Sequence, residues 1–153
     1  MILVDANVLL RLIQIGHPHQ QPALDAIALL HSRDREQLVI CSQTLYEMYA
    51  VCTRPVDAPN PGLGLTPVAA MEQLETAERQ FHLEPEPPAV TSRWKELVVR
   101  YGVTGKSTHD ARLAALMVDR GISKLLSFND SHFARYTEIV VLNPFDVLGA
   151  SHV

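Results

Sequence analysis

The chain has 153 residues, of which 47% are hydrophobic and 20% are charged, a composition typical of globular proteins rather than disordered ones. At this length we expect one domain over residues 1–153, with enough buried surface for a hydrophobic core. The formal net charge of −4 excludes broad capture of nucleic acid by a basic surface, but it leaves open a nuclease whose acids hold metal ions.

The first thirteen residues are apolar, but they contain Asp5 and Arg11, lack a basic leader and are far too short to span a bilayer. We therefore expect a cytoplasmic protein without a membrane segment. Cys41 and Cys52 are not spaced like zinc ligands, so we interpret both as small buried residues.

Hydrophobic patterning predicts alternating strands and helices along the chain. Strands are predicted at residues 2–4, 38–41, 124–128 and 138–143. Helices are predicted from Asn7, over 20–36 and 42–54, from Thr66 or Pro67, after the "EPEPP" segment at 84–88, over 109–121, and as a short turn after the third strand. The helices on either side of "EPEPP" are expected to form a hairpin. Strands separated by helices favour a parallel sheet with helices on both faces.

In such a sheet, ligands bind outside the carboxyl ends of the strands. Asp5 directly follows the first predicted strand, while Ser127, Asn129 and Asp130 follow a later one, so these residues are expected at the same edge. For Asp5, capping of the following helix and metal binding are both consistent with the sequence. A simple turn would also explain Asn129 and Asp130.

Two further acids lie on predicted helices. Glu47 shares a helix face with Ala50, Val51 and Arg54, although Thr44 to Glu47 also has the spacing of a capping box. Asp110 begins an apolar stripe of Leu113, Ala114 and Met117, although Ser107 to Asp110 has the same capping-box spacing. Carboxylates from distant chain positions suit Mg²⁺ or Mn²⁺, which prefer hard oxygen ligands.

Four segments, "ILVDANVLLRL", "TLYEMYAVCTRP", "GKSTHDARLAALMVDRG" and "LLSFNDSHFARY", resemble the PIN-domain family in this order. More closely, they resemble the VapC-like ribonuclease toxins of type II toxin–antitoxin pairs. The resemblance implies a three-layer α/β/α fold with a central, mostly parallel sheet. It also implies an acidic pocket that binds Mg²⁺ or Mn²⁺ and hydrolyses RNA.

By this resemblance Asp5, Glu47 and Asp110 match the family's first three acids, and Asp5 and Asp110 are the expected metal ligands. Ser127 matches a conserved hydroxyl position, and either Asn129 or Asp130 takes the fourth catalytic position. Phosphate binding is expected of Arg54, Lys106 and Ser127, with Arg112 as a weaker candidate. An antitoxin partner and homodimerisation are further expectations.

Two other functions remain open from the sequence. "VDAN" after a strand resembles the start of a phosphatase with an aspartate nucleophile, although Asn7 replaces the general acid that such an enzyme needs. In a non-catalytic binding or assembly module, the acids would serve only as helix caps.

Overall fold

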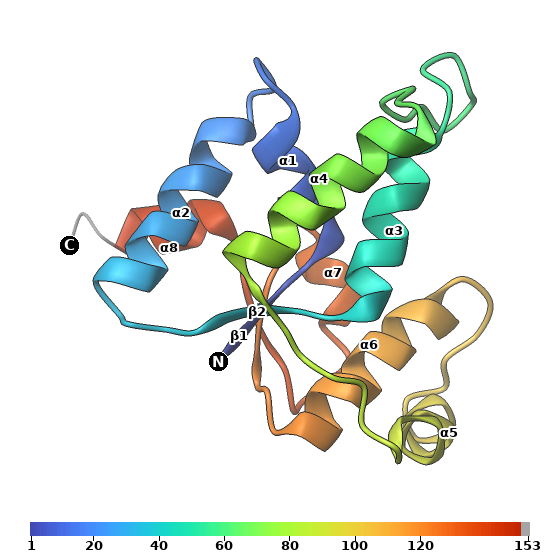
Figure 1. The fold of residues 1–153 in the computed structure, drawn as a ribbon. Coiled ribbons are helices and arrows are strands. Elements are labelled where there is room, and N and C mark those ends of the chain that lie inside the picture. Colours follow the sequence, from blue (N-terminus) through green and yellow to red (C-terminus); the bar gives the residue numbers. More distant parts are fainter. Residues whose placement is uncertain (151–153) are drawn as a thin grey trace.

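The computed structural model describes residues 1–150, which contain a five-stranded, all-parallel sheet (Figure 1). The strands are β1 (Ile2–Val4), β2 (Leu38–Ile40), β3 (His82–Leu83), β4 (Lys124–Leu126) and β5 (Val140–Leu142). Their order across the sheet is β3-β2-β1-β4-β5. In chain order, β2 and β3 lie on one side of β1, whereas β4 and β5 lie on its other side. The crevice outside the carboxyl ends of β1 and β4 is therefore the expected ligand site of this topology.

The helices form layers on both faces of the sheet. They are α1 (Ala6–Ile13), α2 (Gln20–Ser32), α3 (Ser42–Thr53), α4 (Pro67–Gln80), α5 (Val90–Arg100), α6 (Ser107–Arg120), α7 (Asp130–Phe133) and α8 (Pro144–Ala150). Ile2 and Val4 pack with residues of α1 to α4 and α8, whereas Leu3, between them, packs with residues of α5 and α6. This alternation is the period of two expected for a strand, and it confirms the three-layer α/β/α prediction.

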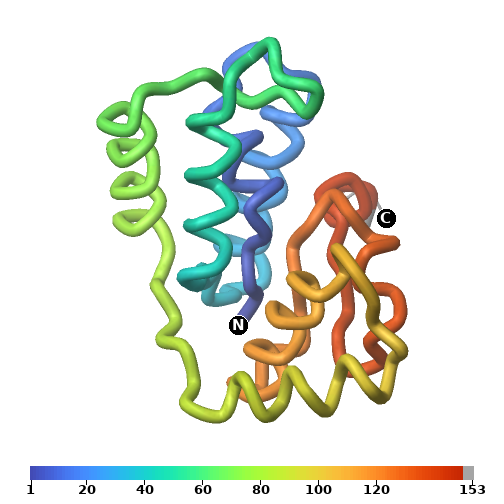
Figure 2. The backbone as a smooth tube through the Cα atoms, turned by 90° about the vertical axis from the view of Figure 1, so that its right-hand side faces the viewer, coloured from blue at the N-terminus to red at the C-terminus, as the bar shows by residue number. Residues whose placement is uncertain are grey.

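The predicted helical hairpin is wrong. α4 packs against α3 on one face of the sheet, while α5 packs against α6 on the other. Figure 2 shows the two helices well apart and joined by an extended segment. This segment contains β3, which the sequence analysis missed because it has only two residues and both are exposed. β3 is defined by its pairing with β2, Val39 opposite His82, rather than by a hydrophobic pattern of its own.

The sequence analysis also missed α8, which packs against α2. Its signal was present in the dipeptide Asn143–Pro144, since Asn is a preferred residue before a helix and Pro is favoured at the first helical position. In the structure the side chain of Asn143 accepts a hydrogen bond from the backbone N–H of Phe145 at 3.0 Å. Both cysteines are free and buried, as predicted. Within residues 1–150, no helix has the length and apolar character needed to cross a membrane.

The Pro/Gly-rich segment after α3, residues 55–66, forms hydrogen bonds with carbonyl groups at the C-terminal end of that helix. Backbone N–H groups of residues 63–65 donate to the carbonyl oxygens of Val51, Arg54 and Cys52 at 3.0, 2.9 and 2.8 Å, respectively. Because the last carbonyls of a helix have no intrahelical partner, this segment satisfies groups that the helix leaves open. It also fixes the backbone at Arg54, which lines the cavity described below.

Gly62→Ala is expected to lower the free energy of unfolding by about 1–3 kcal/mol, the usual cost of overpacking. A Cβ at this position would lie 2.5 Å from both the Cβ and the carbonyl oxygen of Arg54, so the segment would have to move off α3. Urea denaturation measures the effect. Gly149→Ala is the control, because a Cβ there meets nothing within 4 Å. Equal unfolding midpoints for the two variants would contradict the close contact at Gly62.

Candidate active site at the carboxyl edge of the sheet

A cavity of about 310 Å³ lies outside the carboxyl ends of β1 and β4. It brings together five of the predicted site residues, namely Asp5, Glu47, Arg54, Asp110 and Asn129. They come from the end of β1, from α3, from the first turn of α6 and from the connection between β4 and α7. The cavity is therefore assembled from segments that are more than a hundred residues apart in the sequence.

Asp5 is both a cap of α1 and a wall of the cavity. Its Oδ1 accepts a hydrogen bond from the backbone N–H of Ala6 at 2.8 Å, as the capping interpretation predicts. Its Oδ2 accepts from the hydroxyl of Ser127 at 2.8 Å and from the amide of Asn7 at 3.2 Å. Only 6% of the residue is exposed. Capping and a functional role are therefore compatible here, since each oxygen of a carboxylate has more than one acceptor site.

Ser127 holds Asp5 in place and is itself fully buried, with 0% of its surface exposed. Its Oγ donates to Asp5 and accepts from the amide of Asn7 and from the backbone N–H of Asn129, both at 3.0 Å. All hydrogen-bonding positions of this hydroxyl are thus in use. The prediction that Ser127 contacts substrate is therefore not consistent with the structure, because no surface is left for such a contact.

Asn7 is a site residue that the sequence analysis missed. Besides its two bonds to Asp5 and Ser127, its Oδ1 accepts from the backbone N–H of Phe128 at 3.1 Å. One amide thus joins the end of β1 to the end of β4. No local pattern indicated this role, because two of the three bonds of Asn7 go to residues 120 and 121 positions away in the sequence.

Asn7→Ala is expected to lower the free energy of unfolding by about 1–3 kcal/mol, because it leaves the Phe128 N–H unpaired in a half-buried position. Urea denaturation in metal-free buffer measures this change. Asn60→Ala is the matched control, since Asn60 is exposed and, among residues 1–150, only its backbone carbonyl is bonded, to Arg54. A loss no larger than that of the control would mean that Asn7 does not connect the two strands energetically.

Glu47 lies on the second turn of α3 and is half-buried. The predicted capping box from Thr44 to Glu47 is wrong, because α3 begins at Ser42 and Thr44 instead accepts from the backbone N–H of Cys41 at 3.1 Å. Glu47 accepts a hydrogen bond from the amide of Gln43 at 3.0 Å. Its carboxylate is therefore not used by the helix terminus and can act in the cavity.

Asp110 lies in the first turn of α6, and the capping box predicted from Ser107 to Asp110 does not form either. α6 begins at Ser107, and its N-cap, Lys106, makes no side-chain cap bond. The Asp110 carboxylate lies 3.8 Å from Nδ1 of His132, on α7. His132 also lines the cavity and was not selected from the sequence, where no histidine spacing suggested a site.

The three carboxylates disfavour each other's charge. Burial raises the pKa of Asp5 to about 6, and the charge of Glu47 adds to this effect against the opposing hydrogen bond from Ser127. The pKa values of Glu47 and Asp110 are also raised, first by burial and then by the charge of a neighbouring acid, Asp110 and Asp5, respectively. Such a cluster is stabilised by a cation placed between its members.

The donor set fits a largely hydrated divalent ion. Among residues 1–150, no three His, Cys, Asp or Glu side chains lie close enough together to enclose a metal. Mg²⁺ does not need such an enclosure, because it commonly keeps several waters and is held by one or two carboxylates together with substrate phosphate. Asp5 and Asp110 are the carboxylates that would hold it, with Glu47 and Asn129 facing the same cavity.

Three predicted site residues do not line the cavity, namely the buried Ser127, Asp130 and Lys106. Asp130 is exposed and accepts a hydrogen bond from the amide of Asn143 at 2.9 Å, which directs its carboxylate toward the connection between β5 and α8. Asn129, in contrast, lines the cavity. Lys106 is exposed at the start of α6 and is not among the cavity's lining residues. Of the predicted phosphate-binding residues, Arg54 alone lines the described cavity.

Comparison with known proteins gives a consistent result. The family model described as PIN domain matches residues 2–139. A VapBC2 complex from Rickettsia felis, bound to a promoter DNA fragment, is similar with a TM-score of 0.68 and 16% identity, covering 94% of this chain and 98% of that one.

Two further structures show the same fold. VapC20 from Mycobacterium tuberculosis, described as a toxin that cleaves the sarcin–ricin loop, has a TM-score of 0.63 and 19% identity over 89% of this chain and 95% of that one. FitAcB from Neisseria gonorrhoeae has a TM-score of 0.68 and 16% identity over 95% of this chain and 99% of that one. No curated protein matches by sequence. At these identities the solved structures establish a common fold.

Proposed function

Since this chain belongs to the PIN domain family, we propose that it is an endoribonuclease that depends on Mg²⁺ or Mn²⁺ and acts as the toxin of a toxin–antitoxin pair. The observation that carries the proposal is the convergence of Asp5, Glu47 and Asp110 on one cavity at the carboxyl edge of the sheet, with the pKa of each raised by burial and by a neighbouring charge. The toxin activity of the similar VapC20 supports RNA as the substrate.

When bound, a divalent ion would activate water and neutralise charge on the phosphate during hydrolysis. Asp5 and Asp110 hold this ion, and the bonds from Ser127, Asn7 and Ala6 fix the orientation of Asp5. Glu47 orients the attacking water or accepts its proton, a role favoured by its raised pKa. Asn129 contributes a neutral amide to the same cavity.

Arg54 is the cation that we assign to the substrate phosphate. It lines the cavity from the C-terminal end of α3, and within the described residues its guanidinium forms one hydrogen bond to a protein group, a long one of 3.3 Å to the carbonyl of Asn60. Guanidinium groups bind phosphate oxygens in bidentate geometry, so Arg54 can align the phosphodiester with the carboxylates.

The proposal is tested by incubating total RNA with the purified protein and mapping the new ends by sequencing. We expect cleavage in Mg²⁺ or Mn²⁺, and we expect EDTA to stop it. Total RNA is the appropriate substrate because a narrow specificity would go undetected on a generic oligonucleotide. Mapped ends that are the same with and without EDTA would contradict the proposal.

An antitoxin is the proposed protein partner, because a structure with a similar fold, with a TM-score of 0.62 and 18% identity, is described as a toxin–antitoxin complex from Klebsiella pneumoniae.

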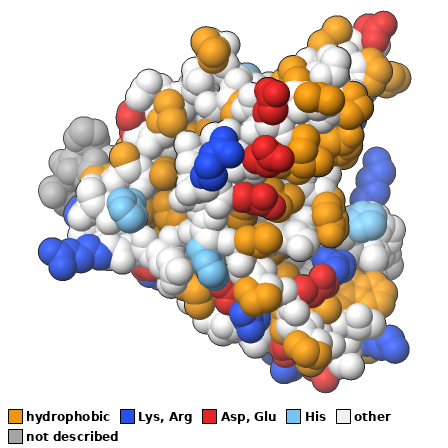
Figure 3. Space-filling model, viewed as in Figure 1, with side chains coloured by type: hydrophobic (Ala, Val, Ile, Leu, Met, Phe, Trp, Pro, Cys, Tyr) orange, Lys and Arg blue, Asp and Glu red, His pale blue; other side chains and the backbone are white. Residues whose placement is uncertain are grey.

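Homodimerisation is a second proposal. It is supported by hydrophobic side chains that are exposed on α3 and α4, namely Tyr46, Val68 and Met71 (Figure 3). A cytoplasmic location remains a prediction from the sequence.

The phosphatase alternative is weakened by the structure. A general acid would be needed two residues after Asp5, where the side chain of Asn7 is already bonded to Asp5, Ser127 and Phe128. The non-catalytic module is distinguished by the response of the free energy of unfolding to added metal.

A further inference from the structure

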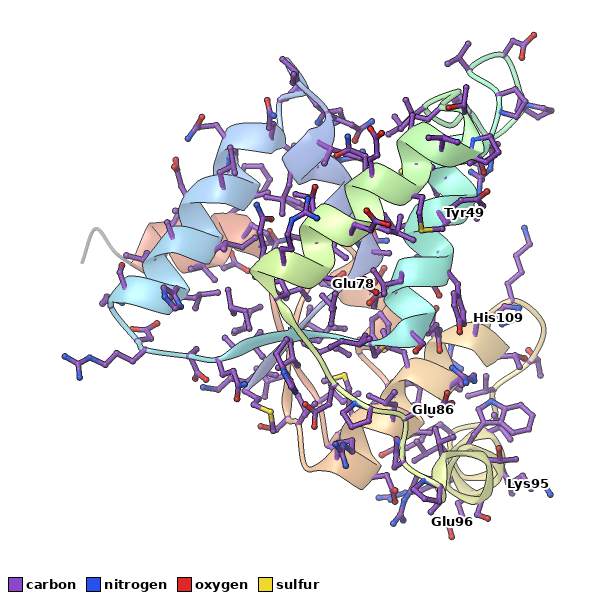
Figure 4. All side chains as sticks on the ribbon, viewed as in Figure 1. Tyr49, Glu78, Glu86, Lys95, Glu96 and His109 are labelled. Atoms are coloured by element: carbon purple, nitrogen blue, oxygen red, sulfur yellow. The ribbon has the colours of Figure 1, made fainter. Side chains whose placement is uncertain are left out.

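A second cavity of about 280 Å³ opens between α5 and α6 and borders the candidate active site. It is lined by Val90, Thr91 and Trp94 from α5 and by Thr108, His109 and Arg112 from α6. His109 lies at the start of α6, on the side toward α3, and it directly precedes Asp110 (Figure 4). The first turn of α6 therefore separates the two cavities and contributes to both.

The buried side chain of Gln43 links the two cavities. Its Nε2 donates to the carboxylate of Glu47 at 3.0 Å and to the carbonyl of His109 at 2.8 Å. Its Oε1 accepts from Nη1 of Arg112 at 3.1 Å. One amide thus holds a carboxylate of the active site together with two residues of the second cavity.

The walls of the second cavity are fixed by bonds within the protein. The indole N–H of Trp94 donates to the carbonyl of Thr108 at 3.2 Å, which sets the orientation of the ring. The guanidinium of Arg112 is held by Gln43 and by the carboxylate of Glu86, in the connection from β3 to α5 (Figure 4). Walls ordered in advance lose little conformational entropy when a ligand binds.

The polar groups of the cavity suit the edge of a nucleobase. Among residues 1–150, no protein group forms a hydrogen bond with the hydroxyls of Thr91 and Thr108 or with the imidazole of His109. No carboxylate lines this cavity in the described part of the chain, in contrast to its neighbour. Proteins that bind single-stranded RNA stack bases on aromatic and guanidinium groups and read the base edges by hydrogen bonds. The volume of the cavity is about 280 Å³, slightly below the ~300–1,000 Å³ of sites that bind drug-sized ligands. A cavity of this volume suits a single nucleobase.

We propose that this cavity binds one base of the RNA substrate, next to the scissile bond, and thereby contributes to sequence preference. Trp94 supplies the stacking surface, and Thr91, Thr108 and His109 contact the edge of the base. The inference rests on the proposed nuclease function, because it assumes that the backbone of the same RNA strand passes through the acidic cavity.

Trp94 makes the site directly observable, since it is the only tryptophan in the chain. The full-length protein in EDTA is titrated with a short RNA and with AMP, GMP, CMP and UMP while tryptophan emission is recorded. We expect saturable quenching by the RNA, and affinities for the four nucleotides that differ by about fivefold or more. An RNA titration without quenching would overturn the proposal.

Thr91→Phe tests the same site by filling it. Thr91 is exposed at the rim, so the variant should unfold at the wild-type urea concentration, while RNA affinity falls by about tenfold, the loss of one stacked base. The control His31→Ala, on the exposed side of α2, should bind RNA as the wild type does. Equal quenching in Thr91→Phe and the wild type would contradict the assignment.

Two further outcomes separate this inference from others. Tryptophan emission that changes with protein concentration in the absence of RNA would mean that a second copy of the chain fills the cavity, which would overturn the base site. The quenching does not require catalysis. Quenching without any cleavage of RNA would support the base site and overturn the proposed nuclease, whereas cleavage without quenching would overturn the base site alone.

Discussion

Asp110→Asn is expected to reduce RNA cleavage on the order of a hundredfold or more, because it removes one of the two carboxylates proposed to hold the metal ion. The substitution preserves the shape of the side chain. Within the described residues the side chain of Asp110 forms no helix-cap bond, and its carboxylate lies 3.8 Å from Nδ1 of His132. The variant should therefore fold as the wild type does. Cleavage is measured as the initial rate on the preferred RNA, with circular dichroism as the check on folding.

Asp130→Asn is the matched control, since it makes the same chemical change in an acid outside the cavity. Its carboxylate is bonded to Asn143 and faces the connection between β5 and α8. We expect the wild-type rate from this variant. If Asp130→Asn lost as much activity as Asp110→Asn, the fourth catalytic position would be Asp130 rather than Asn129, and the assignment of the cavity would be wrong.

The second large effect is a loss of stability with rising pH in metal-free buffer. The pKa of Asp5 is about 6 in the folded protein and 3.8 in its ordinary state, so between these values the folded state binds more protons than the unfolded state. The contribution of Asp5 to the free energy of unfolding is thus fully present below pH 3.8. It is lost as the pH rises through about 6. A shift of this size corresponds to roughly 3 kcal/mol. The raised pKa values of Glu47 and Asp110 act in the same direction.

Asp5→Asn should remove the Asp5 part of this loss, so that the variant is more stable than the wild type at pH 7.5 without metal but not at pH 4. Comparing the two proteins by urea denaturation at each pH cancels the contributions of distant groups. Mn²⁺ added at pH 7.5 should stabilise the wild type by mass action and the variant much less.

The same experiment distinguishes the non-catalytic module. If Asp5 were only a cap of α1, burial would still raise its pKa, so the response to Mn²⁺ rather than the response to pH separates the two functions. In the non-catalytic module Mn²⁺ would stabilise neither the wild type nor Asp5→Asn. That result would count against a metal-dependent enzyme.

Much of the site could be predicted because its acids follow local patterns. Asp5 interrupts an apolar run at the end of β1, so its position places it at the sheet edge, and Asp110 begins the buried stripe of α6, so its helical period directs it inward. The helix face that Glu47 shares with Ala50, Val51 and Arg54 was also correctly identified, and all four residues line the cavity.

The capping boxes predicted at Thr44 and Ser107 failed for a different reason. A capping box depends on the residue at which the helix begins, and boundaries are the least certain part of a hydrophobic pattern. α3 begins at Ser42 because Thr44 bonds the backbone of Cys41, a choice that the spacing of polar residues does not reveal.

By itself, the sequence determined the alternation of strands and helices, the parallel sheet and the place of Asp5 at the end of a strand, because hydrophobic period and strand-end position are local properties of the chain. The set of three acids followed from the resemblance of four segments to the PIN-domain family. The tertiary structure alone decided that Asn129 rather than Asp130 enters the cavity and that Ser127 supports Asp5. These outcomes depend on bonds to Asn143 and Asp5, which are 13 and 122 residues away in the sequence. The short β3 was likewise decided by its pairing with β2. Partners at such separations are chosen by packing of the whole fold, and no local pattern encodes them.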